Sequence, residues 1–309
     1  MKRGRSFLLL LALAAGVGAY VWFVELERDM NAPETPAEKV FAVEVDQLQE
    51  VRLRNEAGEE NVLQRSGDRW VFAGQDGVDV DPAEAADLAS GLAGLESQRV
   101  VDEQPPALAE YGLETPRVTV SFTDAAGAER TLLIGNRTPT GGDLYAKLAD
   151  SPRVFLIGAW LDETFNRSRF DLRDKAALKF SRDAVTNVTL TSGEGTVALA
   201  QAGGEWRLTS PEEAPADNAA ADAIVNALSS ARMQSVVDTP DPAAMGLARP
   251  AVTASVTAGP TRAVLEIGGP APDGTRYARD AVRGLVFTVD ASLAEQMSKT
   301  AADLRRKDQ

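Results

Sequence analysis

The stretch Val100-Val101-Asp102, followed at short range by Tyr111-Gly112-Leu113 and Pro116, decides the fold because the chain contains it twice. The second copy consists of Val236-Val237-Asp238, Met245-Gly246-Leu247 and Pro250. The same landmarks return in the same order, which is the signature of an internal repeat. We therefore predict a tandem duplication in which one module of roughly 130 residues is used twice.

The neighbours of this stretch recur as well, and they define the elements of the module. Corresponding pairs are Asp46 and Asp183, Trp70 and Trp206, Asp81 and Asp217, Gly135 and Gly268, Tyr145 and Tyr277, Phe155 and Phe287, and Leu172 and Leu304. The alternating run from Val118 to Phe122 indicates an antiparallel strand with one solvated face. Asp81-Pro82 supplies a helix N-cap and a first-turn proline. Residues 160–174 are predicted to close the first module as a single helix.

The fold class that follows is α+β, with an N-terminal transmembrane helix and then two tandem homologous α+β modules with mainly antiparallel sheets. Two copies are too few for a long solenoid. This leaves either two α+β units or one pseudo-twofold sheet that both copies share. The predicted boundaries are residues 1–24 for the anchor, 25–39 for a linker, 40–176 for the first module and 177–309 for the second.

The composition excludes several classes of function. A net charge of −14 gives a surface that repels nucleic acid, because phosphate binding requires the opposite sign. The chain has no cysteine and no histidine, which removes disulfides, thiolate metal sites, cysteine nucleophiles and any Ser-His-Asp triad. Catalysis would have to depend on Asp, Glu, Lys, Ser, Thr or Tyr alone.

The N-terminus has the pattern of a membrane anchor. Three basic residues precede an uncharged run over residues 6–24, and Glu25 ends it. Residues 7–24 would form a helix of about 27 Å, close to the thickness of a hydrocarbon core. The basic end should stay in the cytoplasm, which places both modules outside. The alternative is a cleavable signal peptide with a small-residue site at Val17-Gly18-Ala19, although the apolar run continues past it.

The densest acidic cluster has two interpretations. It consists of Asp76, Asp79, Asp81, Glu84 and Asp87. Several carboxylates close together are typical of calcium sites, but the central glycine and terminal glutamate of an EF-hand loop are missing. Helix capping and the helix dipole already explain acids at this position, and the second module keeps only Asp217 and Asp222 there. We therefore expect capping and solvation here.

Three further features also have a structural and a functional interpretation. The glycine-rich residues 135–142 lack the Gly-Lys-Ser/Thr ending of a phosphate-binding loop, and we expect a hairpin connection. Trp70 and Trp206 follow turns and could stack on a sugar or a lipid tail, but their repetition favours a core role. Tyr111 could act as an acid, but Met245 occupies its place in the second module, which favours packing.

The end of the first module combines acids with bases. Its carboxylates are Asp162, Glu163, Asp171 and Asp174, and Arg167, Arg169 and Arg173 lie close in the sequence. An acid/base pair is one interpretation, and solvated helix faces with i,i+4 ion pairs are the one we expect. The sequence therefore nominates no catalytic, cofactor-binding or metal-binding residue and implies no cofactor.

The combined pattern resembles a bacterial membrane-anchored family, domain of unknown function 4340. The matching stretches are the basic start with its apolar run, Gly67-Asp68-Arg69-Trp70, Val100-Val101-Asp102, residues 111–117, residues 133–141, Tyr145-Ala146 and residues 171–175. The second module departs from the pattern at Met245 and at Pro270-Ala271-Pro272. This difference leaves open whether both copies bind the same thing.

The resemblance implies a role as an extracytoplasmic companion of a gliding-motility-type ABC transporter system, with its permease and an auxiliary membrane protein as partners. We therefore expect a non-catalytic auxiliary subunit that is a single-pass protein of the bacterial inner membrane, with its N-terminus in the cytoplasm and its modules in the periplasm. The alternatives are a cell-envelope hydrolase that uses carboxylates and a passive envelope scaffold.

Overall fold

The computed structural model describes residues 38–74 and 78–307. The predicted anchor, residues 1–24, and most of the predicted linker, residues 25–39, lie outside these ranges. Within the part of the chain that is described, no helix is both long and apolar enough to cross a bilayer.

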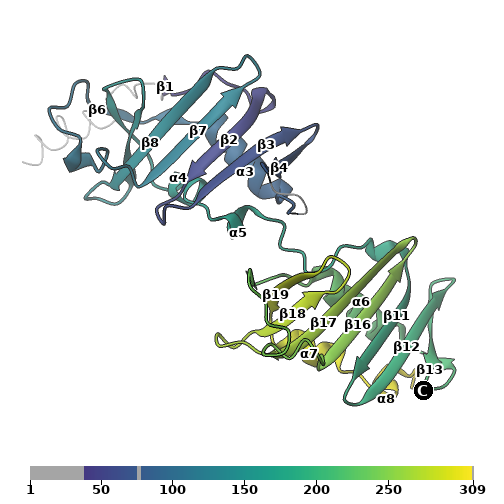
Figure 1. Ribbon diagram of the computed structural model, residues 1–309. Helices are drawn as coiled ribbons and strands as arrows, with labels where there is room; N and C mark the ends of the chain where they lie inside the picture. Colours follow the sequence, from purple (N-terminus) through teal and green to yellow (C-terminus); the bar gives the residue numbers. More distant parts are fainter. Residues whose placement is uncertain (1–37, 75–77, 308–309) are drawn as a thin grey trace, which may run out of the picture. The chain divides into compact units, whose positions relative to one another are not determined.

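The first module is built on an eight-stranded sheet with the order β4-β3-β2-β7-β8-β9-β10-β6 (Figure 1). Its strands are β2 (Leu48–Arg54), β3 (Glu60–Ser66), β4 (Arg69–Phe72), β6 (Arg99–Asp102), β7 (Val118–Asp124), β8 (Glu129–Arg137), β9 (Asp143–Leu148) and β10 (Val154–Gly158). A separate antiparallel pair joins β1 (Glu38–Lys39) to β5 (Glu96–Ser97). On β7, buried residues alternate with half-buried ones, as the sequence pattern predicts.

The second module has a nine-stranded sheet with the order β14-β13-β12-β11-β16-β17-β18-β19-β15. Its strands are β11 (Val185–Ser192), β12 (Gly195–Ala202), β13 (Glu205–Ser210), β14 (Ala214–Pro215), β15 (Ser235–Val236), β16 (Val252–Ala258), β17 (Thr261–Pro270), β18 (Arg276–Asp280) and β19 (Leu285–Val289). Every neighbouring pair in this sheet is antiparallel. The short strand β14 extends the sheet beyond β13.

The two strand orders are the same once β14 is set aside. The first four strands, β4-β3-β2-β7, correspond to β13-β12-β11-β16, and the remaining four correspond to β17-β18-β19-β15. This agreement supports the prediction of two tandem α+β modules with mainly antiparallel sheets. The alternative prediction of one sheet shared by both copies is wrong, because each copy builds a sheet of its own.

Six α-helices accompany the sheets in the described residues. They are α3 (Pro82–Ala93), α4 (Leu161–Phe165), α5 (Arg169–Leu172), α6 (Asn218–Ser230), α7 (Ser292–Met297) and α8 (Ala301–Leu304). Short 3-10 helices form at η2 (Val45–Gln47), η3 (Ala109–Tyr111) and η4 (Arg182–Ala184).

The prediction of one closing helix over residues 160–174 is wrong, because this segment forms two short helices, α4 and α5. The side chain of Ser168 accepts a hydrogen bond from the backbone N–H of Asp171, and the Asp171 carboxylate accepts one from the backbone N–H of Ser168. This reciprocal capping box starts a new helix at α5. The interruption also exposes the carbonyl of Arg167, which accepts a hydrogen bond from Asn55.

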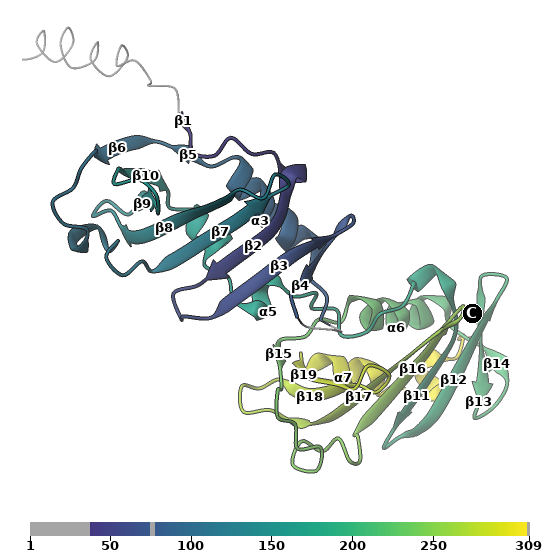
Figure 2. The ribbon, with the colours of Figure 1, turned by 45° about the horizontal axis from the view of Figure 1, so that its top comes forward.

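The core of the second module lies between its sheet and its helices. Figure 2 shows α6 and α7 over one face of this sheet. Ile224 and Leu228 of α6 and Met297 of α7 belong to one buried cluster with strand residues such as Phe287. Burial of each large apolar side chain contributes about 1.5–3 kcal/mol.

The repeated signature is explained by close backbone packing in each module. A Cβ atom on Gly135 would lie 2.1 Å from the carbonyl oxygen of Tyr111, and one on Gly268 would lie 2.3 Å from that of Met245. Only glycine permits such an approach. Both glycines lie where the strand pairing shifts, after Ile134 in β8 and after Ile267 in β17. The paired motifs are therefore a packing requirement of the module.

Candidate functional site

The acidic cluster that invited a calcium interpretation is used for capping and ion pairs. The Asp81 carboxylate accepts a hydrogen bond of 2.9 Å from the backbone N–H of Ala83 at the start of α3. Glu84 and Asp87 lie 3.3 and 3.7 Å from the guanidinium of Arg167. Asp76 lies outside the described residues. Within residues 38–74 and 78–307, no group of three or more acids is placed to hold a metal ion.

The second module repeats the cap but not the rest of the cluster. Asp217 accepts hydrogen bonds from the backbone N–H groups of Ala219 and Ala220 at the start of α6. Asp222 instead accepts one of 2.9 Å from Nε1 of Trp206. The prediction that Asp217 caps a helix is therefore confirmed.

The carboxylates at the end of the first module do not meet as an acid/base pair. Asp162 lies between two arginines, with Arg117 Nη2 2.6 Å from Oδ1 and Arg137 Nη2 2.9 Å from Oδ2. These are not the arginines that lie close to it in the sequence. Asp171 is held by Ser168. Burial alone would raise the pKa of Asp171, but the hydrogen bonds from Ser168 bring it below its usual value.

Of the glycine-rich residues 135–142, the first three end strand β8, and residues 138–142 form the predicted hairpin connection to β9. The backbone N–H of Thr138 donates to the carbonyl of Asp143 at 2.9 Å, and that of Gly141 donates to Thr138 at 2.8 Å. Arg117 Nε also donates to the carbonyl of Gly135 at 3.3 Å. In the second module Arg276 contacts the corresponding carbonyl of Gly268 at 2.6 Å, so different arginines perform one structural role.

The two repeated tryptophans differ in burial. Trp206 is buried, as predicted, and its ring nitrogen is bonded to Asp222. Trp70 is only half-buried, and the guanidinium of Arg65 lies 5.5 Å from its ring centroid. The prediction of a core role is right for Trp206 and wrong for Trp70, which lies on the edge strand β4 where a cation covers the ring.

Tyr111 packs against an aromatic neighbour, as expected. Its ring lies edge-on to Tyr145 with 5.1 Å between the centroids. Burial, Glu110 and Asp102 together raise the pKa of Tyr111 above its usual value. The contact with Tyr145 agrees with the packing role expected for Tyr111.

The first segment of each module, which we call its incoming segment, is bonded to the rest of the module in the same way. The incoming segments are residues 38–40 in the first module and residues 176–177 in the second. In the first module, the backbone N–H of Val40 donates to the carbonyl of Leu95 at 2.9 Å. In the second, Ala177 donates to Ala231 at the same distance. Ala176 also forms a β-bridge with Arg232, as Lys39 pairs with Glu96. The duplication therefore includes the segments through which the chain enters each module.

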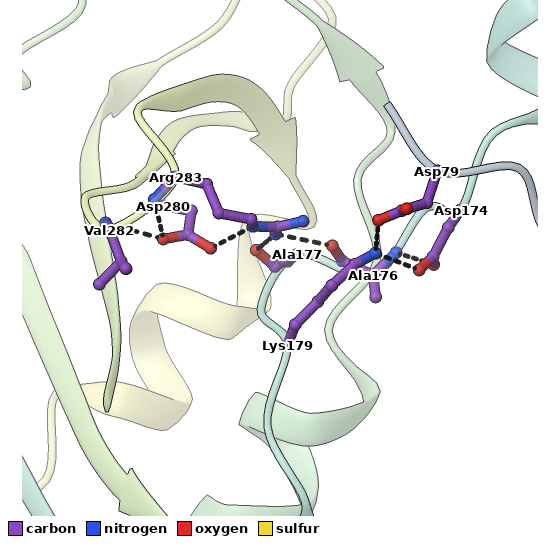
Figure 3. A network of polar contacts seen from close by, with 8 residues as sticks. All are labelled: Asp79, Asp174, Ala176, Ala177, Lys179, Asp280, Val282 and Arg283. Carbon is purple, nitrogen blue, oxygen red and sulfur yellow. Dashed lines mark hydrogen bonds and ion pairs between the residues drawn. The ribbon is translucent and has the colours of Figure 1, made fainter. Parts of the chain in front are cut away.

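An arginine holds the incoming segment of the second module (Figure 3). Arg283 Nη2 donates to the carbonyl oxygens of Ala176 and Ala177 at 3.1 and 2.7 Å. Arg283 Nε lies 2.6 Å from Oδ2 of Asp280, whose side chain is 3% exposed. The other oxygen of Asp280 accepts hydrogen bonds from the backbone N–H groups of Val282 and Arg283. We call Arg283, Asp280, Ala176 and Ala177 the arginine clamp.

The first module has a weaker counterpart of this clamp. Arg153, in the turn between β9 and β10, lies 3.0 Å from the Glu38 carboxylate, and Glu38 is 68% exposed. Close to the arginine clamp, Lys179 pairs with Asp79 and lies 3.0 Å from Asp174 (Figure 3). The exposed pair of Arg153 and Glu38 should contribute less than about 1 kcal/mol to the stability of the first module, because solvent screens it.

The outer faces of the two sheets carry different charges. Arg279 Nη2 lies 2.5 Å from the carboxylate of Glu266 on the neighbouring strand. At the corresponding cross-strand position of the first module, Leu133 faces Lys147. Lys147 is only 7% exposed, and its Nζ donates to the carbonyl of Leu148 at 2.7 Å. Burial lowers the pKa of Lys147, an effect that Asp150 partly offsets.

Trp160 is a feature that sequence reasoning missed, because it is the first residue of the helix predicted over residues 160–174. It directly precedes α4 and is 65% exposed. The position that follows from the repeat in the second module is Ser292. An unmatched aromatic residue in an otherwise repeated element was the signal that could have identified it.

The described part of the second module has at least three cavities. One of about 390 Å³ has apolar walls from α6, α7 and α8, including Ile224, Met297 and Leu304. Another, of about 220 Å³, is polar and is lined by Asp183, Asp222 and Trp206 among others. A third, of about 270 Å³, is lined by residues of α6, of α7 and of the segments next to them. A smaller cavity of about 190 Å³ in the first module lies between the incoming segment and Arg153.

Comparison with known proteins identifies a family but no activity. The profile described as "Domain of unknown function (DUF4340)" matches residues 70–250 and again residues 206–309. The first match runs through parts of both modules, and the second lies within the second module. No curated protein and no solved structure matches the chain. The matched residues cover more than half of the chain, which therefore belongs to the domain-of-unknown-function 4340 family.

Proposed function

We propose that this chain is a non-catalytic auxiliary subunit of a gliding-motility-type ABC transporter complex in the bacterial inner membrane. A single N-terminal helix over residues 1–24 anchors it, and both modules face the periplasm. The basic residues before the apolar run support this orientation. The permease and an auxiliary membrane protein of the transporter are the proposed partners.

One observation carries the non-catalytic part of the proposal. Apart from the exposed Glu163, the carboxylates that the sequence analysis considered for chemistry have a structural partner wherever the structure describes them. Asp81 and Asp171 cap helices, and Asp162 and Asp174 pair with basic side chains. Carboxylates held in this way stabilise the modules, which leaves the exposed surfaces for contact with other proteins.

The polar cavity of the second module favours one alternative, a hydrolase that uses carboxylates. Asp183 and Asp222 both line it, and Trp206 forms part of its wall. A glycosidase needs two carboxyl groups about 5 to 9 Å apart across a substrate. Asp222 already accepts a hydrogen bond from Trp206, which favours a structural role. Loss of an envelope-hydrolase activity in both Asp183→Asn and Asp222→Asn, with folding intact, would favour the alternative.

Chemical crosslinking in intact membranes, followed by mass spectrometry, tests the proposed function. The proposal predicts crosslinks from the periplasmic modules to the permease or the auxiliary membrane protein of an ABC transporter. Crosslinks confined to soluble envelope proteins would contradict it.

The orientation has a clean test because the chain contains no cysteine. A single cysteine introduced as Val282→Cys lies at a position that is 60% exposed. A membrane-impermeant maleimide should label it from the periplasmic side of spheroplasts. The matched variant Lys2→Cys should be labelled only after the membrane is permeabilised, and the reverse pattern would contradict the topology.

A further inference from the structure

The helices of the second module surround an apolar cavity. Helix α6 contacts both α7 and α8, and the cavity of about 390 Å³ lies where the three helices meet. Its apolar wall consists of Ala220, Ala223, Ile224, Met297 and Leu304. Small-molecule sites have volumes of about 300–1,000 Å³ and mostly apolar walls with a few polar groups. We call this space the helix cavity, and it has the size and the lining of a site for an apolar ligand.

The first module has the same helices but carries carboxylates where the second has alanines. The corresponding residues, from the register of the repeat, are Glu84 and Ala220, Asp87 and Ala223, and Arg167 and Lys299. A capping box directly follows each of the two basic residues, at Ser168 in the first module and at Thr300 in the second. These matching caps confirm the register, so the two modules can be compared position by position.

In the first module, a basic side chain links the two sides of this position. The Arg167 guanidinium, between α4 and α5, lies 3.3 Å from the Glu84 carboxylate and 3.7 Å from that of Asp87 on α3. The side chains of Arg167 and Glu84 are only 27% and 26% exposed. The first module therefore shows what occupies the position between these helices, namely carboxylates held by a base.

In the second module, the basic residue has lost these carboxylates. Lys299 lines the helix cavity, and within residues 38–74 and 78–307 no carboxylate forms an ion pair with its ammonium group. Asp303 also lines the cavity, but its Oδ2 accepts hydrogen bonds from the backbone N–H and the hydroxyl of Thr300 at 2.9 and 2.7 Å. These bonds, and then the charges of Lys299 and Lys307, lower the pKa of Asp303. Asp303 therefore belongs to the cap of α8.

The other charged groups on these elements do not replace the missing carboxylates. Three of them have structural partners, namely Asp217 at the cap of α6, Asp222 on Trp206 and Arg305 on Glu212. The others that the structure describes on α6, on α7 and after α8 are one acid, Glu295, and two bases, Arg306 and Lys307, and all three are exposed. An anion that approaches the cavity therefore meets more exposed bases than exposed acids, although the whole chain has a net charge of −14.

The segment after α8 leads away from the helix cavity. Arg305 forms a β-bridge with Ala216, and the backbone N–H of Arg306 donates to the carbonyl of Pro215 at 3.0 Å. This pairing carries the chain along β14, whereas the cavity lies against the part of α6 that contains Ala223.

We propose that the helix cavity binds a single-chain aliphatic carboxylate of the fatty-acid class, with its chain between the three helices and its carboxylate on Lys299. The ligand carboxylate takes the place that Glu84 and Asp87 have beside Arg167. An aliphatic chain fits because the residues that line the cavity include no aromatic ring. A hydrogen bond between an ammonium and a carboxylate is also stronger than one between neutral groups. The site lies within one module and does not depend on the proposed transporter role.

Photoaffinity labelling of the full-length chain in its native membranes tests the site. The probe is dodecanoic acid with a diazirine in its chain, and mass spectrometry identifies the labelled peptides. Peptides of α6, α7 or α8 should be labelled, and unlabelled dodecanoic acid should compete. Dodecanol with the same diazirine should label them about tenfold less, because it cannot form the ionic bond to Lys299. Equal labelling by the alcohol, or no saturable labelling of these peptides, would overturn the proposal.

Variants of the cavity separate the site from general adsorption to the module. Ala220→Glu combined with Ala223→Asp gives the second module the carboxylates of the first, so labelling by the acid should fall about tenfold or more. Asn226→Asp adds an acid to an exposed position of α6 outside the cavity and should leave labelling unchanged. Lys299→Met, at an exposed position, should lower labelling by the acid and leave labelling by the alcohol unchanged. Labelling that is the same in all these variants would overturn the site.

Discussion

Substitution of Arg283 by alanine should destabilise the second module far more than substitution of Arg153 destabilises the first. Both arginines hold the incoming segment of their module, but their surroundings differ. Arg283 pairs with Asp280, whose side chain is 3% exposed, and also donates to two backbone carbonyls. Arg153 pairs with Glu38, which is 68% exposed. The two substitutions therefore test how burial changes the contribution of an ion pair to the stability of its module.

The expected magnitudes follow from this difference. Arg283→Ala leaves a buried carboxylate without its cation, and removal of one partner of a buried pair costs about 3–5 kcal/mol. Arg153→Ala breaks an exposed pair and should cost less than about 1 kcal/mol. The double variant Asp280→Asn with Arg283→Ala should recover part of the loss, because the stranded charge is then absent.

Hydrogen exchange of the full-length protein in detergent micelles, followed by mass spectrometry, measures both effects. The informative amides are Ala177, which donates to Ala231, and Val40, which donates to Leu95. Arg283→Ala should accelerate exchange of Ala177 by about a hundredfold or more, since each 1.4 kcal/mol is a factor of ten. Equal, small changes at Ala177 and Val40 in the two variants would refute the reasoning.

Three further predictions concern the repeat signature, the buried lysine and the ion pair in the second module. Gly135→Ala should lower the free energy of unfolding by at least about 1–3 kcal/mol, because the new Cβ atom would collide with the backbone carbonyl of Tyr111. Gly142→Ala is the control in thermal unfolding, because a Cβ atom at position 142 has open space around it. Burial lowers the pKa of Lys147 in the folded protein, so the unfolded chain binds the Lys147 proton more tightly. The free energy of unfolding should therefore rise as the pH increases toward the ordinary lysine pKa of about 10.4. Urea unfolding of Lys147→Met should not show that rise. Glu266→Leu should lower the urea midpoint by leaving Arg279 without its carboxylate, whereas Glu163→Leu on exposed surface should not.

The duplication could be predicted from the sequence because its causes are local. Gly135 and Gly268 must be glycine wherever the loop before them packs on the strand, so the motif survives in both modules. Alternation on β7 follows in the same way from one buried face. The split between α4 and α5 was missed because its cause is the capping box of Ser168 and Asp171, which competes with an apolar pattern that continues through it.

The surface features could not be predicted because they depend on contacts between distant residues. Asp162 is bound by Arg117 and Arg137 through the strand order, and no spacing along the chain reveals those partners. The arginine clamp likewise joins Arg283 to carbonyls of Ala176 and Ala177, more than a hundred positions earlier. The exposure of Trp160 depends on how Gly158 and Gln98 support its ring.

Purification of the full-length chain from its native membranes in a mild detergent, with quantitative mass spectrometry of what remains bound, tests the central claim most directly. The proposal predicts that the permease and the auxiliary membrane protein of one ABC transporter are recovered in fixed proportion to the chain. Recovery of the chain alone, under conditions in which another transporter complex stays intact, would contradict it.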